Sequence, residues 1–141
     1  MTTRADVVAE ARTWIGVPWV HQHRSRQGVD CAGLIICVAR DLGLLPADFD
    51  LNGYSRRPDG TLLAVCDEHM DRIDRSAMQP GDVLVVATEH DPQHMGILGD
   101  YRHGGLSLIH AASKAGRVIE TRLMFAANQK FRGGYALRGV A

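Results

Sequence analysis

The sequence predicts an α+β domain in which N-terminal helices pack on a central antiparallel β-sheet. Up to Met70, apolar residues recur at three- and four-residue spacing, as on the buried face of a helix. After Pro80–Gly81 the pattern changes to short apolar runs separated by Gly, Asp and Asn, which is typical of consecutive strands. The length of 141 residues fits one domain, so we expect a single domain over residues 1–141.

The first helix is predicted directly after Thr3. Thr3 and Asp6 have the spacing of a capping box, in which each side chain bonds the other residue's backbone N–H. The apolar stripe that follows ends at Gly16 and consists of Val7, Val8, Ala11, Trp14 and Ile15. Pro18 disfavours helical geometry in the residue before it, so we expect residues 17–20 to be extended and to lead into a polar loop.

A second helix is predicted after the stretch Gly28–Leu34. Asp30 is a suitable N-cap and Gly43 a suitable C-terminal stop, and the apolar face between them contains Leu34, Ile35, Val38 and Leu42. Cys31 then occupies the first helical position, where unpaired N–H groups and the helix dipole lower the pKa of a thiol. A free cysteine at this position also fits a small buried core residue.

The rest of the chain predicts a long loop, a third helix and a series of strands. Residues 44–60 are rich in polar residues, Gly and Pro and contain Tyr54, and long loops in compact domains are often functional. A helix is expected over residues 61–70, with Cys66 on its apolar stripe; we expect Cys37 and Cys66 to be inert core residues. The expected strands are 83–87, 94–98, 106–109, 117–121 and 135–138.

Composition narrows the classes of function. Lysine plus arginine equals aspartate plus glutamate, sixteen of each, so no net field favours nucleic acid or an anionic membrane. There is no run of about 18 apolar residues, and residues 1–6 lack the apolar segment of a secretory signal, so we expect cytoplasmic synthesis without membrane insertion. Three cysteines argue against a disulfide framework. His90 and His94 have the spacing of a helical zinc pair but Pro92 separates them, so we expect neither a metal nor a cofactor.

Two histidines at strand positions complete a candidate catalytic constellation with Cys31. A thiolate nucleophile needs an imidazole within reach, and that imidazole needs a third group to orient it. If the strands 94–98 and 106–110 pair with Leu98 opposite Leu106, then His94 lies directly opposite His110, with Cβ atoms about 5 Å apart. One ring would then act as the base and the other as its orienting partner.

Four motifs in this order resemble those of NlpC/P60 cysteine peptidases. They are Gly28–Leu34 (GVDCAGL), Pro80–Val83 (PGDV), His94–Ile97 (HMGI), and Ile109–Ala111 followed by Gly116–Glu120. The resemblance covers nearly the whole chain and implies a papain-like core that cuts peptidoglycan stem peptides. It further implies Cys31 as the nucleophile, His94 as the base and His110 as the third polar residue.

Two further stretches resemble the phage-tail branch of the family and the related gene-transfer-agent tails. They are residues 18–22 (PWVHQ) and 54–60 (YSRRPDG). This resemblance implies that the protein is assembled into a virion-like tail with other tail proteins and acts in the target cell envelope. Trp19 stands where many NlpC/P60 members have a tyrosine, and Ala32 replaces the serine that commonly follows the cysteine in that family.

The expected substrate is a stem peptide cut between D-glutamate and a diamino acid. Trp19, Asp30 and Tyr54 are expected to line the cleft, and the arginines that are candidates for the substrate carboxylates are Arg24, Arg26, Arg56 and Arg57. Two other functions stay open at this point. One is a catalytically inactive structural protein of a tail tip, and the other is a thiol amidase or acyltransferase acting on lipid substrates.

Overall fold

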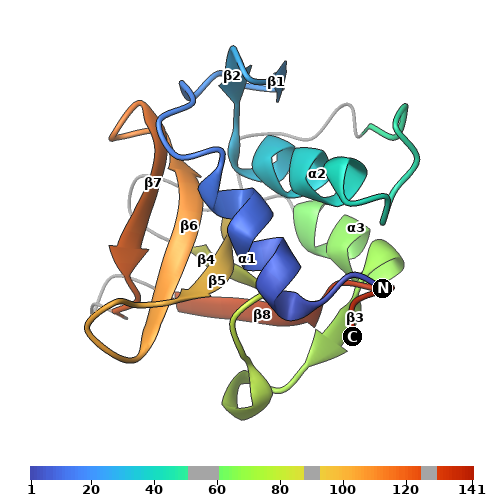
Figure 1. Cartoon of the computed structure of the whole chain (residues 1–141), viewed down its shortest axis with the longest axis vertical. Helices are drawn as coiled ribbons and strands as arrows, with labels where there is room; N and C mark the ends of the chain where they lie inside the picture. The colour runs from blue at the N-terminus through green and yellow to red at the C-terminus, as the bar shows by residue number, and fades with distance from the viewer. Residues whose placement is uncertain (51–60, 88–92, 125–129) are drawn as a thin grey trace.

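The computed structural model describes residues 1–50, 61–87, 93–124 and 130–141, and it shows helices packed on an antiparallel sheet (Figure 1). Within these residues the helices are α1 (Arg4–Arg12), α2 (Cys31–Asp41) and α3 (Thr61–His69), with a 3₁₀ turn at Arg75–Ala77. None of the described helices is long and apolar enough to cross a membrane. The predicted α+β class, with N-terminal helices on a central antiparallel sheet, is confirmed.

The described part of the chain forms a six-stranded sheet in the order β3-β8-β4-β5-β6-β7, with neighbouring strands antiparallel. Its strands are β3 (Asp71–Ile73), β4 (Val83–Ala87), β5 (His94–Asp100), β6 (Leu106–Ala112), β7 (Arg117–Arg122) and β8 (Lys130–Ala136). β4 has the predicted bounds, and β5 to β7 begin where predicted and run further. Of the described strands β8 comes last in sequence, yet it lies inside the sheet, between β3 and β4.

The prediction of a final strand over residues 135–138 is wrong, because β8 begins at Lys130 and ends at Ala136. Two glycines in its interior, which resemble a turn signal in the sequence, lie against close neighbours. A Cβ at Gly134 would lie 2.7 Å from the sulfur of Met78, and a Cβ at Gly133 would lie 2.9 Å from the ring of Tyr135.

The helix boundaries follow the predicted caps. In the capping box of α1, Thr3 Oγ1 accepts the Asp6 N–H at 3.1 Å and the Asp6 carboxylate accepts the Thr3 N–H at 2.8 Å. α2 begins at Cys31 and is followed by Gly43 at φ +72°. Ile15 was expected on the buried stripe of the first helix, but α1 ends at Arg12 and Ile15 is 47% exposed.

The two faces of the sheet carry separate apolar clusters. The larger cluster lies between sheet and helices and includes Leu34, Val38, Met95, Ile97, Ile109 and Ala111. The smaller cluster, on the opposite face, is formed by Leu84, Val86, Leu98 and Leu108. Because side chains alternate along a strand, His94 shares the face of Leu98, and His110 shares the face of Leu108.

The polar approach to α2 is more ordered than the predicted loop. It contains a short hairpin of β1 (Arg24–Ser25) and β2 (Gly28–Val29). Gly28 is required there, since a Cβ would lie 2.5 Å from Val20 Cγ2. The guanidinium of Arg26 lies 3.8 Å from the ring centroid of Trp14 and donates to the Thr13 carbonyl at 2.8 Å, so the hairpin is attached to the end of α1.

Candidate active site

The Asp30 carboxylate joins the start of α2 to the chain segment that leads into it. Its Oδ1 accepts the Gly33 N–H at 2.7 Å, which confirms the predicted N-cap, and its Oδ2 accepts the Gln22 N–H at 2.7 Å. Arg24 Nη1 donates to Oδ1 at 3.1 Å. Asp30 is only 2% exposed, and these charge-assisted bonds offset the desolvation of its carboxylate.

Gly33 leaves the space in which this network forms. A Cβ at this position would lie 2.5 Å from the His23 carbonyl oxygen and 2.9 Å from Arg24 Nη1. Any larger residue would therefore separate Arg24 from Asp30 or displace the backbone at His23. The glycine two residues after Cys31 is thus explained by the packing of the cap.

Cys31 is the first residue of α2 and is partly exposed. Its Sγ lies 3.8 Å from the carbonyl oxygen of Gln93, the residue directly before β5. The N-terminus of α2 therefore meets the beginning of β5, where His94 is located. The unpaired N–H groups and the dipole of α2 stabilise a thiolate at this position.

His94 and His110 are in direct contact, although the predicted pairing of their strands is wrong. Their atoms Nε2 and Nδ1 are 2.6 Å apart, and their ring centroids are 4.8 Å apart at an interplanar angle of 73°. The register pairs Leu98 with Leu108, two residues from the expected partner Leu106. The two histidines are therefore diagonal neighbours, and their rings bridge the offset.

The observed register occurs together with a tight turn between the two strands. β5 runs through Asp100, which pairs with Leu106, so the connection is shorter than the predicted loop over residues 100–105. Gly104 and Gly105 have φ values of +96° and +80°, and the Tyr101 N–H donates to the Gly105 carbonyl at 3.0 Å. Glycine adopts such angles readily, which permits the short connection.

Burial keeps His94 in its neutral form near pH 7. The residue is 4% exposed, and this desolvation lowers the pKa of His94 to about 4. Its imidazole is therefore neutral near pH 7. Because Nε2 faces His110, Nδ1 is the nitrogen with which His94 would take a proton from a thiol.

Thr121, on β7, is a neighbour of this pair that is not predicted from the sequence. Its Oγ1 lies 3.2 Å from His110 Nε2, so His110 is placed between His94 and a hydroxyl group. The sequence contains only a weak signal for this contact. A strand expected over residues 117–121, directly after the strand of His110, predicts that some side chain of β7 reaches His110, but it does not predict which one.

The other residues expected at the cleft have different surroundings. Trp19 is partly buried and stacks on His21 with ring centroids 6.3 Å apart, and His21 Nδ1 lies 3.6 Å from Asp30 Oδ2. Asp30 is buried in the cap described above. Tyr54, like Arg56, Arg57 and His90, lies outside the described residues.

Arg24 was expected to be a candidate for binding a substrate carboxylate, but it has a structural role. Its side chain is 8% exposed, and its Nε donates to Asp50 at 2.8 Å while Nη1 donates to Asp30. Arg26 packs on Trp14, with its side chain half exposed. Among the described residues there is no group of three His, Cys, Asp or Glu side chains arranged to hold a metal ion.

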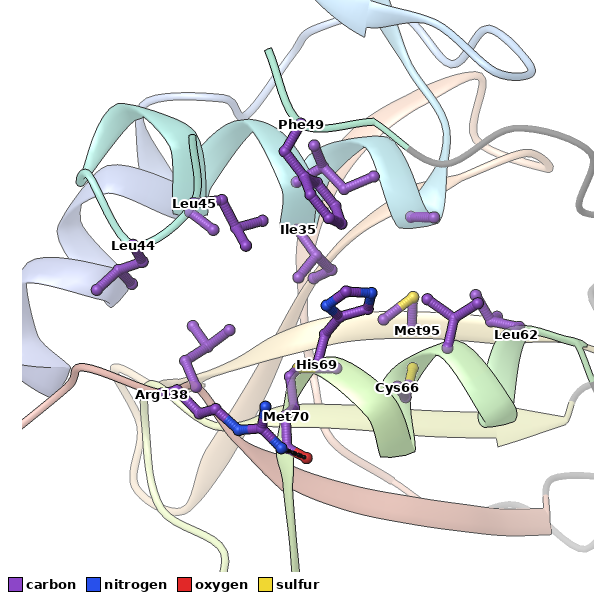
Figure 2. A pocket seen from close by; sticks show the side chains of 15 residues that line it. Ile35, Leu44, Leu45, Phe49, Leu62, Cys66, His69, Met70, Met95 and Arg138 are labelled. Carbon is purple, nitrogen blue, oxygen red and sulfur yellow. Dashed lines mark hydrogen bonds between the residues drawn. The ribbon is translucent and has the colours of Figure 1, made fainter. Parts of the chain in front are cut away.

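A large apolar cavity lies between α2, α3 and residues 44–49 (Figure 2), and its lining includes Ala32 and Met95 but not Cys31, His94 or His110. It encloses about 610 Å³, including the part open to solvent. At its rim His69 packs edge-on against Phe49, with centroids 5.1 Å apart, and the Arg138 guanidinium donates to Asp71 at 3.1 Å. Its lining includes Cys66 and His69, but burial raises the pKa of the Cys66 thiol to about 12, so this cysteine is a poor nucleophile and the candidate chemistry is assigned to the N-terminus of α2.

Comparison with known proteins found a matching family model and several solved structures of similar fold. The model of the NlpC/P60 family matches residues 16–131. The NlpC/p60 domain of the peptidoglycan hydrolase SagA is similar in structure, with 22% identity and a TM-score of 0.67 over 96% of this chain and 100% of that one. NlpC1 from Trichomonas vaginalis has 17% identity and a TM-score of 0.70 over 97% of this chain, which spans 45% of that protein.

An N-acetylmuramoyl-L-alanine amidase from Bacteroides uniformis has 14% identity and a TM-score of 0.59, over 94% of this chain and 96% of that one. A search of curated protein sequences found no match. At these identities the similar structures establish the fold, which is the predicted papain-like one.

Cys31 should alkylate faster than Cys37 and Cys66. Cys31 is partly exposed at a helix N-terminus, whereas burial raises the pKa of the Cys37 thiol and raises that of Cys66 to about 12. Brief treatment of the folded protein with iodoacetamide near neutral pH, followed by peptide mapping, measures this. Labelling in urea provides the control, in which all three should react alike; equal labelling of the folded protein would contradict the prediction.

His94 should make the folded protein less stable in acid. Its pKa is about 4 when folded, against about 6.5 in an unfolded chain, so between these values only the unfolded state binds the proton. The free energy of unfolding should fall by about 2–3 kcal/mol from about pH 7 to about pH 4.5 because of this group, with no effect of this group above the unfolded value. Urea unfolding of wild type and His94→Gln isolates the effect, since other titrating groups cancel. Equal losses in both proteins would contradict it.

Proposed function

The chain belongs to the NlpC/P60 family, and on that premise we propose that it is a cysteine peptidase that hydrolyses peptidoglycan stem peptides. The observation that carries the proposal is the meeting of α2 and β5. Cys31 Sγ lies 3.8 Å from the carbonyl of the residue before His94, and His94 is 2.6 Å from His110. The beginning of α2 and the beginning of β5 are thus near one another, which supports Cys31 as the nucleophile, His94 as the base and His110 as the orienting group.

In the first half of the reaction, His94 Nδ1 takes the proton of the Cys31 thiol as the sulfur attacks the peptide carbonyl carbon. Because His94 is neutral near pH 7, it can accept this proton. The carbonyl oxygen gains negative charge, and the backbone N–H of Cys31, at the positive end of the α2 dipole, stabilises it.

In the second half, protonated His94 donates to the leaving amine, and the peptide C–N bond breaks to leave a thioester on Cys31. Water then attacks the thioester carbonyl while His94 removes its proton, which releases the carboxylic acid and restores the thiol. His110 stabilises the imidazolium that His94 becomes in each half.

The substrate bond we propose is the one between D-glutamate and a diamino acid. Support comes from the order of the four sequence motifs and from the similarity to a domain of a named peptidoglycan hydrolase. An amide bond elsewhere in peptidoglycan, a lipid substrate, and an inactive structural protein are the competing outcomes, and one digestion experiment distinguishes them.

We further propose that the protein acts from a phage-like or gene-transfer-agent tail. One support is the likeness of residues 18–22 and 54–60 to that branch. The other is the net charge of zero: no electrostatic attraction concentrates the protein on an anionic wall, so it needs another means of reaching its substrate. Mounting on a particle would supply a high effective concentration at the cell surface.

Isolated peptidoglycan should yield fragments cut within the stem peptide when digested by the wild-type protein. Mass spectrometry of the fragments identifies the new termini. Cys31→Ala should release none while keeping the wild-type circular dichroism spectrum, because only the nucleophile is lost. Fragments cut in the glycan strand, or equal release by Cys31→Ala, would refute the proposed chemistry; turnover of a lipid amide alone would support the acyltransferase alternative.

His94 should matter more than His110. His94→Ala removes the base and should abolish turnover, whereas His110→Asn should retain measurable activity, because an orienting group contributes up to about 10⁴-fold. Initial rates on a soluble tetrapeptide stem measure both. Activity in His94→Ala together with none in His110→Asn would reverse the two roles.

Particles that carry Cys31→Ala should attach to cells normally but deliver DNA poorly, because local wall cleavage is lost after attachment. Counts of attached particles and of recipient cells separate the two steps. Undiminished delivery by Cys31→Ala particles would refute the tail proposal while leaving the hydrolysis tested above unaffected.

A further inference from the structure

The protonated state of His94 places a requirement on His110. When His94 holds a proton on both ring nitrogens, its Nε2 can only donate, so the atom 2.6 Å away, His110 Nδ1, must accept. A neutral His110 that accepts at Nδ1 carries its own proton on Nε2. That proton in turn needs an acceptor.

Thr121 lies where this acceptor is required. Its Oγ1 is 3.2 Å from His110 Nε2. In the β6–β7 register His110 pairs with Ile119, and Leu108 pairs with Thr121, so Thr121 is the diagonal neighbour of His110 on the same sheet face. It approaches from β7 while His94 approaches from β5, on the opposite side of His110.

We propose that Thr121 is a positioning residue, whose hydroxyl oxygen accepts the Nε2–H of His110 and so keeps His110 Nδ1 as the acceptor for His94. The proposal rests on the proposed function, in which His94 takes the thiol proton. In the resulting series of hydrogen bonds, His94 Nε2–H donates to His110 Nδ1, and His110 Nε2–H donates to Thr121 Oγ1.

The opposite arrangement is unproductive. If Thr121 donated to His110 Nε2, the His110 proton would lie on Nδ1 and would be donated to His94 Nε2. The neutral His94 would then carry its proton on Nδ1, the nitrogen that has to receive the proton of Cys31. The acceptor role of Thr121 therefore favours the base form of His94.

Thr121→Val and Thr121→Ser test the role, because the first has nearly the same shape without a hydroxyl and the second retains the hydroxyl. On a soluble tetrapeptide stem, Thr121→Val should lower kcat by about three- to tenfold with little change in KM, as for one lost hydrogen bond, and Thr121→Ser should restore most of it. Thr121→Ala provides a second variant without the hydroxyl, and thermal unfolding verifies that each variant is folded.

Nitrogen-15 NMR of the histidine rings gives a readout that does not depend on turnover. In wild type and Thr121→Ser, His94 and His110 should both be protonated at Nε2; in Thr121→Val a resolved fraction should shift to protonation at Nδ1. Wild-type His110 protonated at Nδ1, or an unchanged proton position in Thr121→Val, would overturn the proposal even if kcat falls. If no form hydrolyses the peptide, the proposed function fails, and the NMR comparison still decides the role of Thr121.

Discussion

The structure around the candidate site depends on one buried carboxylate. Asp30 receives hydrogen bonds from the N–H of Gly33, inside α2, and from the N–H of Gln22, at the beginning of the approach segment. Arg24 neutralises it and extends the contact to Asp50. A buried carboxylate without these donors would be strongly destabilising, so the approach segment, the hairpin and the first turn of α2 have to adopt their positions together. The position of the Cys31 sulfur follows from that arrangement.

Local signals in the sequence predicted much of the fold. The capping box at Thr3 and the N-cap at Asp30 each involve residues within three positions of one another, so both can be predicted from the sequence without knowledge of the tertiary structure. The apolar run of β4 was equally clear, because a strand buried on both faces has no polar alternation. The placement of Cys31 at the first helical position came from these signals alone.

Features set by distant neighbours could not be predicted in the same way. The β5–β6 register depends on the backbone angles of Gly104 and Gly105, and an assumed pairing missed it by two residues. The glycines inside β8 resemble a turn until Met78 and the Tyr135 ring are seen to occupy their side-chain space. Thr121 becomes relevant only through its distance to His110, which depends on two strand registers. Local chemistry thus predicted the site's elements, whereas long-range packing determined their alignment.

The interior position of β8 has a consequence for the timing of synthesis. β8 leaves the ribosome after the other five strands of this sheet, yet it pairs with β4, which in turn supports the His94 end of β5 through the Val86–His94 pair. The thiol of Cys31 emerges much earlier, 62 residues before its contact at Gln93. Non-local pairing of this kind forms late, after the intervening chain is available. A nascent chain therefore presents Cys31 before its neighbours on the sheet are in place, and the hydrolase activity that we propose would arise only once β8 has completed the sheet.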